Sequence, residues 1–128
     1  TKQGQAKIFM IVDAAMTELV RPTLYGAHHD IGLVRQSEEK LLAWDVVGPV
    51  CESGDFLGLA RELPELEPGA LLAVFSAGAY GAVLGSSYNT RPAAPEVLVE
   101  GARHDVVRRR PSYADMLAGE KVPDWLSS

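Results

Sequence analysis

The segment 51–55, with the sequence CESGD, brings a thiol and two carboxylates together. It follows the apolar run 46–50, whose Gly-Pro pair indicates a strand that ends in a turn. Cys51 is either a small buried hydrophobic residue or an exposed residue at the tip of this turn, and the local sequence leaves both interpretations open. Because neighbouring carboxylates disfavour a thiolate, we expect Cys51 to have a positioning role rather than to act as a nucleophile.

Four other side chains in the chain are suited to binding a charged ligand. A carboxylate at a turn, such as Glu52, is either solvated or binds a cationic amine. Arg21 and Tyr25 lie on either side of Pro22, and a guanidinium binds carboxylates in a bidentate manner. Tyr80 lies between glycine and alanine residues that let the backbone approach a ligand closely. The alternatives are a surface arginine with a packed tyrosine for the first pair, and a sheet bend with a packed tyrosine for Tyr80.

Two other polar motifs have weaker functional interpretations. His28 and His29 have no further ligands at metal-binding spacing, so we predict no metal site. The run of three arginines at 108–110 is interpreted as the solvated end of a strand.

Mostly strands and short turns are predicted to position these residues. Asp13 is a possible N-cap for a helical turn over 13–19, which Pro22 limits. Ser112 is the predicted N-cap of a short helix over 112–117 that stops at Gly119. The predicted strands are 7–13, 31–35, 41–47, 55–59, 71–75, 97–99 and 104–107; a polar turn is predicted over 37–40, a loop over 63–69, and the last two strands should form a hairpin.

Length and composition set the class of protein. The chain has 128 residues, 47% of them hydrophobic, which is typical of one soluble globular domain. The net charge of −5 argues against nucleic acid as a partner. No apolar run has the roughly 20 residues of a membrane span, and no signal peptide is recognised. The single cysteine excludes an internal disulfide, which fits a reducing, cytoplasmic compartment. Because the chain begins at Thr1, we expect it to be a piece of a longer protein.

The predicted elements favour a mainly β fold. Strands and short turns dominate, strand–helix alternation is absent, and no glycine-rich phosphate loop is found. We therefore predict a barrel or sandwich with short helices, one of them near the C-terminus, rather than a doubly wound sheet.

Four segments resemble, in order, the C-terminal β-domain of diaminopimelate decarboxylase, a fold-type III pyridoxal-phosphate enzyme related to alanine racemase and ornithine decarboxylase. The resemblance runs from about Phe9 to Val107, and CESGD distinguishes this family from its ornithine-type relatives. Ala15, Thr17 and Ser76 depart from the family pattern. The segments are 11–16 with 21–25 (IVDAAM, RPTLY), 47–55 (VGPVCESGD), 77–81 (AGAYG), and 86–92 with 96–99 (SSYNTRP, EVLV).

This resemblance implies a Greek-key β-barrel or sandwich over residues 1–128 and a set of site roles. The family converts meso-diaminopimelate to L-lysine and CO₂ with pyridoxal phosphate. Arg21 and Tyr25 are implied to bind a substrate carboxylate, and Glu52 to bind the ammonium at the distal, non-reacting centre. Tyr80 is implied to contact cofactor and substrate. Cys51 is implied to lie in the catalytic centre, with Glu52, across the interface of a homodimer.

The resemblance also implies that much of the enzyme lies outside this chain. The family's N-terminal α/β barrel carries the Schiff-base lysine, and none of the lysines here (Lys2, Lys7, Lys40, Lys121) has a matching context. We therefore predict that the isolated chain is inactive. The alternative is a non-catalytic binding or assembly module that derives from the same domain.

Overall fold

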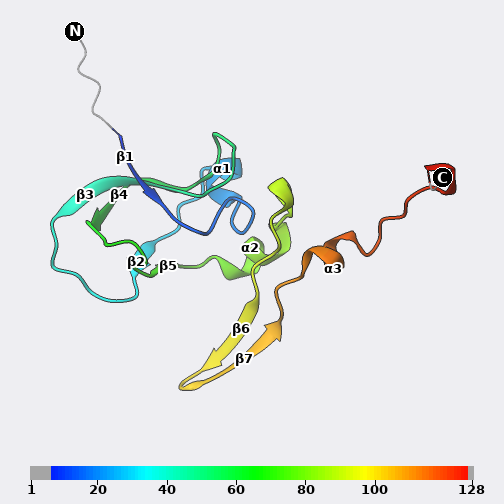
Figure 1. Cartoon of the computed structure of the whole chain (residues 1–128). Coiled ribbons are helices and arrows are strands. Elements are labelled where there is room, and N and C mark those ends of the chain that lie inside the picture. Colours follow the sequence, from blue (N-terminus) through cyan, green and yellow to red (C-terminus); the bar gives the residue numbers. More distant parts are fainter. Residues whose placement is uncertain (1–6, 127–128) are drawn as a thin grey trace, which may run out of the picture. The chain divides into compact units, whose positions relative to one another are not determined.

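A computed structural model describes residues 7–126. The chain divides into two compact units, Thr1–Asn89 and Thr90–Ser128, which are considered separately. Figure 1 shows the elements along the chain. In the first unit these are β1 (Ile8–Ile11), α1 (Arg21–Tyr25), β2 (Ile31–Leu33), β3 (Leu41–Val47), β4 (Phe56–Pro64), β5 (Leu72–Val74) and α2 (Gly78–Leu84). A 3₁₀ turn (Tyr88–Thr90) precedes β6 (Glu96–Glu100), β7 (Arg103–Arg108), α3 (Tyr113–Leu117) and a second 3₁₀ turn (Asp124–Leu126).

The first unit is built on two small sheets. In one, β3 lies between β1, which runs parallel to it, and β4, which runs antiparallel. In the other, β2 pairs with β5 in the antiparallel sense. The prediction of a mainly β fold is therefore confirmed. With the sheet of the second unit included, the described residues form three separate sheets and no closed barrel.

The core of the first unit lies where the larger sheet meets the segment before α1. Its buried residues are Leu19, Val46, Leu57 and Leu63, and partly buried apolar side chains such as Trp44 pack against them. Because Val46 and Leu57 are neighbours of the β3–β4 turn, burial of these side chains fixes where that turn emerges from the sheet.

A register shift in the β3–β4 pair is held by Asp45, whose side chain is nearly inaccessible. Asp45 Oδ1 accepts a hydrogen bond of 2.9 Å from the N–H of Ala60, which has a positive φ of 51°. Asp45 Oδ2 lies 3.1 Å from Nζ of Lys7. The Ala60 N–H, followed by Lys7, lowers the pKa of Asp45.

Replacing Asp45 with alanine is expected to lower the free energy of unfolding of this chain by about 2 kcal/mol, because the Ala60 N–H loses a charged acceptor. Folding lowers the pKa of Asp45. Its contribution to the free energy of unfolding is therefore complete above about pH 4 and is lost as the pH falls through the pKa of the folded state. Urea unfolding at pH 7 and pH 3 measures both effects. Glu62→Ala, an exposed change on β4, is the control, and an equal loss at both pH values in Asp45→Ala would contradict the assignment.

The second unit contains the predicted hairpin and the predicted C-terminal helix. β6 and β7 pair in the antiparallel sense around Gly101, which has a positive φ of 61°. None of the described residues from 90 to 126 is buried. Exposed apolar side chains therefore cover the hairpin, among them Val97, Leu98, Val99, Val106 and Val107.

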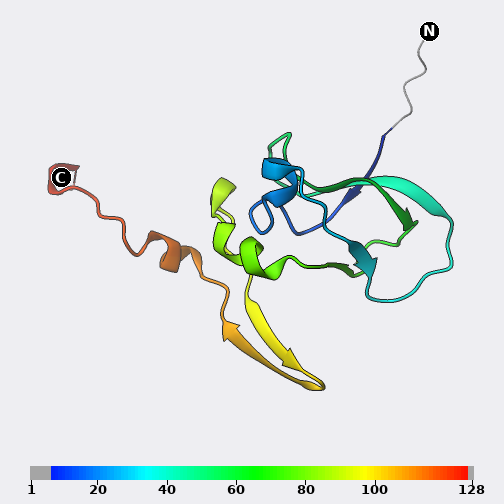
Figure 2. The same cartoon turned by 180° about the vertical axis from the view of Figure 1, so that it is seen from behind.

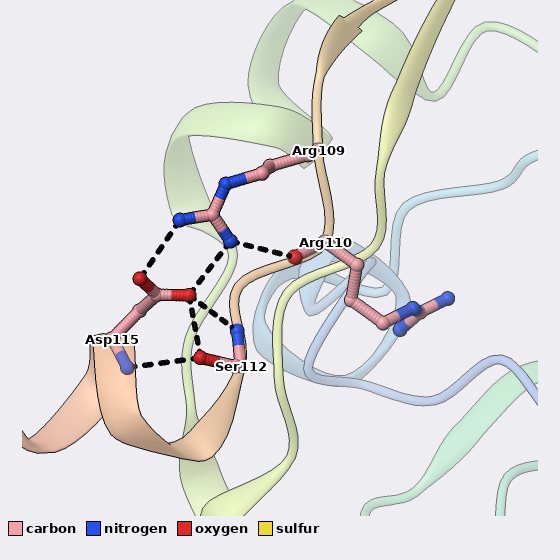
Figure 3. Close-up of polar contacts among 4 residues, drawn as sticks. All are labelled: Arg109, Arg110, Ser112 and Asp115. Atoms are coloured by element: carbon pink, nitrogen blue, oxygen red, sulfur yellow. Dashed lines mark hydrogen bonds and ion pairs between the residues drawn. The ribbon is translucent and has the colours of Figure 1, made fainter.

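Helix α3 begins with a capping box, as Ser112 predicts (Figure 3). The Ser112 hydroxyl accepts from the Asp115 N–H at 3.1 Å, and the Asp115 carboxylate accepts from the Ser112 N–H at 2.7 Å. Arg109 donates to both oxygens of this carboxylate, at 2.7 and 2.8 Å, and holds the pKa of Asp115 well below its usual range. The arginine run is exposed, as expected, but Arg109 has a defined partner.

The structure refines three local predictions. The helical turn predicted over 13–19 is limited to one turn, in which the Ala15 carbonyl accepts from the N–H groups of Glu18 and Leu19. Helix α1 begins only at Arg21, because Pro22 is tolerated in the first turn, where no N–H is needed. Strand β4 continues through Pro64 into the predicted loop. The predicted polar turn over 37–40 lies in a loop that connects two different sheets, since β2 pairs with β5 rather than with β3.

Among residues 7–126, no helix is long and apolar enough to span a membrane.

Candidate functional site

The turn between β3 and β4 presents Cys51 and Glu52 to solvent. Its backbone is closed by hydrogen bonds from the Glu52 N–H to the Val50 carbonyl (2.8 Å) and from the Asp55 N–H to the Glu52 carbonyl (3.0 Å). Cys51 is exposed and is a free thiol. The structure thus selects the exposed tip over the buried hydrophobic residue for Cys51.

Glu52 is held in a defined orientation by local donors. Its Oε1 accepts from the Ser53 hydroxyl at 3.1 Å and from the Gly54 N–H at 3.3 Å, and its Oε2 accepts from the Tyr88 hydroxyl at 3.4 Å. The Gly54 N–H, followed by Ser53, lowers the pKa of Glu52. Glu52 is therefore a charged, exposed carboxylate with lone pairs available to a cation at neutral pH.

Helix α1 packs directly against this turn. The Thr23 hydroxyl donates to the Gly54 carbonyl, and a Cβ added at Gly54 would lie only 2.7 Å from Cγ2 of Thr23. Both views show the β3–β4 turn beside α1 (Figures 1 and 2). The same helix carries Arg21 at its first position and Tyr25 at its last, so the predicted carboxylate-binding pair and Glu52 are brought to one region of the first unit.

Arg21 also contacts the third segment of the site. Its guanidinium carbon lies 5.3 Å from the ring centroid of Tyr80, a cation–π arrangement. Tyr80 lies in α2, so the sheet bend considered for this segment is wrong. Gly81 of α2 is buried, and a Cβ there would lie 3.4 Å from Cδ1 of Leu19. The small residues around Tyr80 therefore bring the helix close to the segment that leads into α1.

Tyr25 and Tyr80 are 64% and 63% exposed. Two phenols, one guanidinium and one carboxylate thus lie on α1, α2 and the β3–β4 turn, and the phenols and the carboxylate are open to solvent. What the described residues offer is recognition of a group that carries both a positive and a negative charge, such as the head of an amino acid.

Three residues that support the site were not assigned a role from the sequence. Tyr88 donates to Glu52, Thr23 joins α1 to the turn, and Asp55 is buried rather than solvated. All three lie within the motifs quoted above, which was the available signal. Of the two histidines without a metal assignment, His29 is buried, with Nδ1 3.1 Å from the carbonyl oxygen of Phe75.

The described residues do not make up a pyridoxal-phosphate site by themselves. A lysine is needed to bind this cofactor covalently. Lys7 pairs with Asp45 at 3.1 Å, Lys121 pairs with Asp124 at 3.4 Å in the second unit, and the carbonyl of Lys40 accepts from the Glu65 N–H beyond the far end of β3. Lys2 lies outside the described residues. Among the described lysines, Lys7 and Lys121 are therefore engaged in ion pairs.

Comparison with known proteins places this arrangement in a family. Residues 1–78 match the model of the pyridoxal-dependent decarboxylase C-terminal sheet domain. The chain is 52% identical over 121 residues to a diaminopimelate decarboxylase of Pseudomonas fluorescens and 47% identical over 121 residues to that of Archaeoglobus fulgidus, covering 94% of this chain and 29% of each relative.

A crystal structure shows the same likeness. The diaminopimelate decarboxylase of Helicobacter pylori complexed with L-lysine matches with a TM-score of 0.82 and 43% identity, over 90% of this chain and 28% of that one. The chain thus spans less than a third of the length of these relatives. Because the family model matches 78 of its 128 residues, the chain belongs to the family of pyridoxal-dependent decarboxylase C-terminal sheet domains.

Proposed function

We propose that this chain is the C-terminal domain of a diaminopimelate decarboxylase, which converts meso-2,6-diaminopimelate to L-lysine and CO₂ in lysine biosynthesis. The observation that carries the proposal is the 52% identity to a diaminopimelate decarboxylase over 94% of this chain, a span that includes Glu52 and Arg21. The substrate's distal centre carries one ammonium and one carboxylate. Glu52 is opposite in charge to the ammonium, and Arg21 is opposite in charge to the carboxylate. A diamine without carboxylates would have no use for Arg21.

In this proposal each side chain has a separate task at the distal end of the substrate. Glu52 binds the ammonium, while Arg21 and Tyr25 bind the carboxylate. Tyr80, held beside Arg21, contacts the substrate and the cofactor. Cys51 lies next to the reacting atoms at the exposed tip of the turn. Pyridoxal phosphate supplies the electron sink for decarboxylation, and a lysine elsewhere in the protein binds it.

The remainder of the enzyme completes both the fold and the site. Strand β1 is at an edge of its sheet, with Phe9 and Ile11 exposed by 55% and 75%. Together with the uncovered β6–β7 hairpin, this edge supports closure of a Greek-key barrel by further strands and cover by an N-terminal α/β barrel. We further propose a cytoplasmic homodimer in which Cys51 and Glu52 are donated to the partner's site.

The experiment that tests the function is an assay of the full-length protein for release of CO₂ and formation of L-lysine from meso-diaminopimelate. Activity that depends on pyridoxal phosphate supports the proposal. An upstream reading frame without a barrel and its lysine, together with no activity, would instead establish a non-catalytic module derived from this domain.

The 128-residue chain alone is expected to be inactive in the same assay, because none of its lysines has a sequence context that resembles the cofactor lysine of the family. After incubation with pyridoxal phosphate and reduction with borohydride, mass spectrometry should find no cofactor attached at Lys2, Lys7, Lys40 or Lys121 beyond the level of a denatured sample. The full-length protein is the positive control. Stoichiometric attachment at one of these four lysines would contradict this prediction.

A further inference from the structure

The phenol of Tyr88 reaches the exposed carboxylate of the β3–β4 turn from outside that turn. Its hydroxyl donates to Oε2 of Glu52 at 3.4 Å, across 36 residues of sequence. The other oxygen, Oε1, accepts from the Ser53 hydroxyl at 3.1 Å and from the Gly54 N–H at 3.3 Å, both within the turn. The two oxygens of this carboxylate are therefore held from two different segments of the first unit.

The segment that carries Tyr88 is itself anchored. Two residues earlier, the Ser86 N–H donates to the carbonyl of Thr17 at 3.0 Å, which ties the chain after α2 to the chain before α1. Directly after Tyr88, Asn89 has a positive φ of 56°, a conformation that asparagine adopts more readily than most residues. A backbone anchor on one side and a sharp change of direction on the other thus set where the phenol is presented.

Tyr88 supports Glu52 without neutralising it. The Gly54 N–H and the Ser53 hydroxyl lower the pKa of Glu52 most, and the Tyr88 hydroxyl lowers it further. A phenol is an uncharged donor at neutral pH, so it does not compete as a cation for the carboxylate. Tyr88 is 48% exposed and Glu52 is exposed as well, so a ligand can approach the carboxylate beside the phenol. Together, the three donors narrow the directions from which an ammonium can be bound.

From these contacts we infer that Tyr88 is a positioning residue, which fixes the Glu52 carboxylate for the ammonium at the distal centre of the substrate. This inference rests on the function proposed above. Because the contact lies within one chain, Tyr88 accompanies the turn into whichever protomer's site the turn enters. Holding a long side chain in place before binding removes part of the rotamer entropy that binding would otherwise cost.

The length of the contact sets the size of the expected effect. At 3.4 Å it is longer than an ordinary hydrogen bond between a hydroxyl and a carboxylate. Loss of the Tyr88 hydroxyl should therefore weaken ammonium binding about fivefold, less than loss of the Glu52 charge itself.

The test measures ligand affinity by calorimetry in the full-length protein with pyridoxal phosphate bound. L-Lysine has an ammonium beside its carboxylate, and 6-aminohexanoate is the same molecule without that ammonium. Tyr88→Phe keeps the ring and removes the hydroxyl, so the Kd for L-lysine should rise about fivefold while that for 6-aminohexanoate changes less than about twofold. Tyr113→Phe, the same change at a tyrosine of α3 that is 61% exposed, is the matched control and should alter neither Kd.

A double variant separates positioning from a merely structural role. In a Glu52→Gln background, Tyr88→Phe should raise the Kd for L-lysine less than about twofold, because the charge being positioned is already absent. A fivefold rise in that background, an equal rise for both ligands, an unchanged Kd for L-lysine in Tyr88→Phe, or a Tyr88→Phe protein that does not fold would overturn the inference. An unsubstituted protein that does not bind L-lysine also overturns it. Binding of L-lysine that depends on Tyr88 and Glu52, without release of CO₂ from meso-diaminopimelate, overturns the proposed function and upholds the role of Tyr88.

Discussion

Glu52→Gln raises the KM of the full-length protein for meso-diaminopimelate about 30-fold and leaves kcat within about threefold. A hydrogen bond to a charged group contributes about 2 kcal/mol, and each 1.4 kcal/mol corresponds to a factor of ten. Glutamine keeps a carbonyl oxygen for the Gly54 N–H, which is 3.3 Å from Glu52 Oε1, so the turn is preserved while the charge is lost. Steady-state kinetics with measured CO₂ release separates the two constants.

The control for this variant is Glu38→Gln, which removes an exposed carboxylate from the loop between β2 and β3. It should change neither constant. Unchanged kinetics in Glu52→Gln would remove Glu52 from the site. Because the pKa of Glu52 is already lowered by the Gly54 N–H, the carboxylate stays ionised through neutral pH. The KM of the unsubstituted protein should therefore show no rise from Glu52 protonation between pH 6 and pH 8.

Arg21→Met raises the KM for meso-diaminopimelate about 100-fold, because the distal carboxylate loses its charged partner at a cost of about 3 kcal/mol. Arg21→Lys should recover part of this loss. Lysine restores the charge, but it lacks the planar fork of the guanidinium that lies 5.3 Å from the Tyr80 ring centroid. Arg35→Met, at an exposed position after β2, is the matched control and should have no effect.

Two inhibitors distinguish the roles of Glu52 and Arg21. L-Lysine retains the distal ammonium and carboxylate, so its inhibition constant should rise in both Glu52→Gln and Arg21→Met. 1,5-Diaminopentane has the ammonium but no carboxylate. Its inhibition should weaken in Glu52→Gln and remain unchanged in Arg21→Met. Equal weakening of 1,5-diaminopentane in both variants would contradict the separate roles.

Features that depend on local chemistry could be predicted from the sequence. A turn at CESGD follows from a strand that meets a Gly-Pro pair, although the sequence left open whether Cys51 is buried or exposed. The β6–β7 hairpin follows from two β-branched runs around Gly101. The Ser112 cap follows from a hydroxyl that satisfies free N–H groups at the start of α3. Segment 78–84 was missed as a helix because its glycines have low helix propensity, and its packing against Leu19 depends on a distant segment.

By itself, the sequence determined which chemical groups this domain offers: a thiol, a carboxylate, a guanidinium and phenols in recognisable motifs. Only the tertiary structure decided which of them meet. Tyr88 reaches Glu52 across 36 residues, and Asp55 reaches Met16 across 39. These contacts depend on the register of β3 and β4 and on burial of Val46 and Leu57, which place the turn against α1. No local propensity encodes such a placement, because it results from the packing of segments that are far apart in the chain.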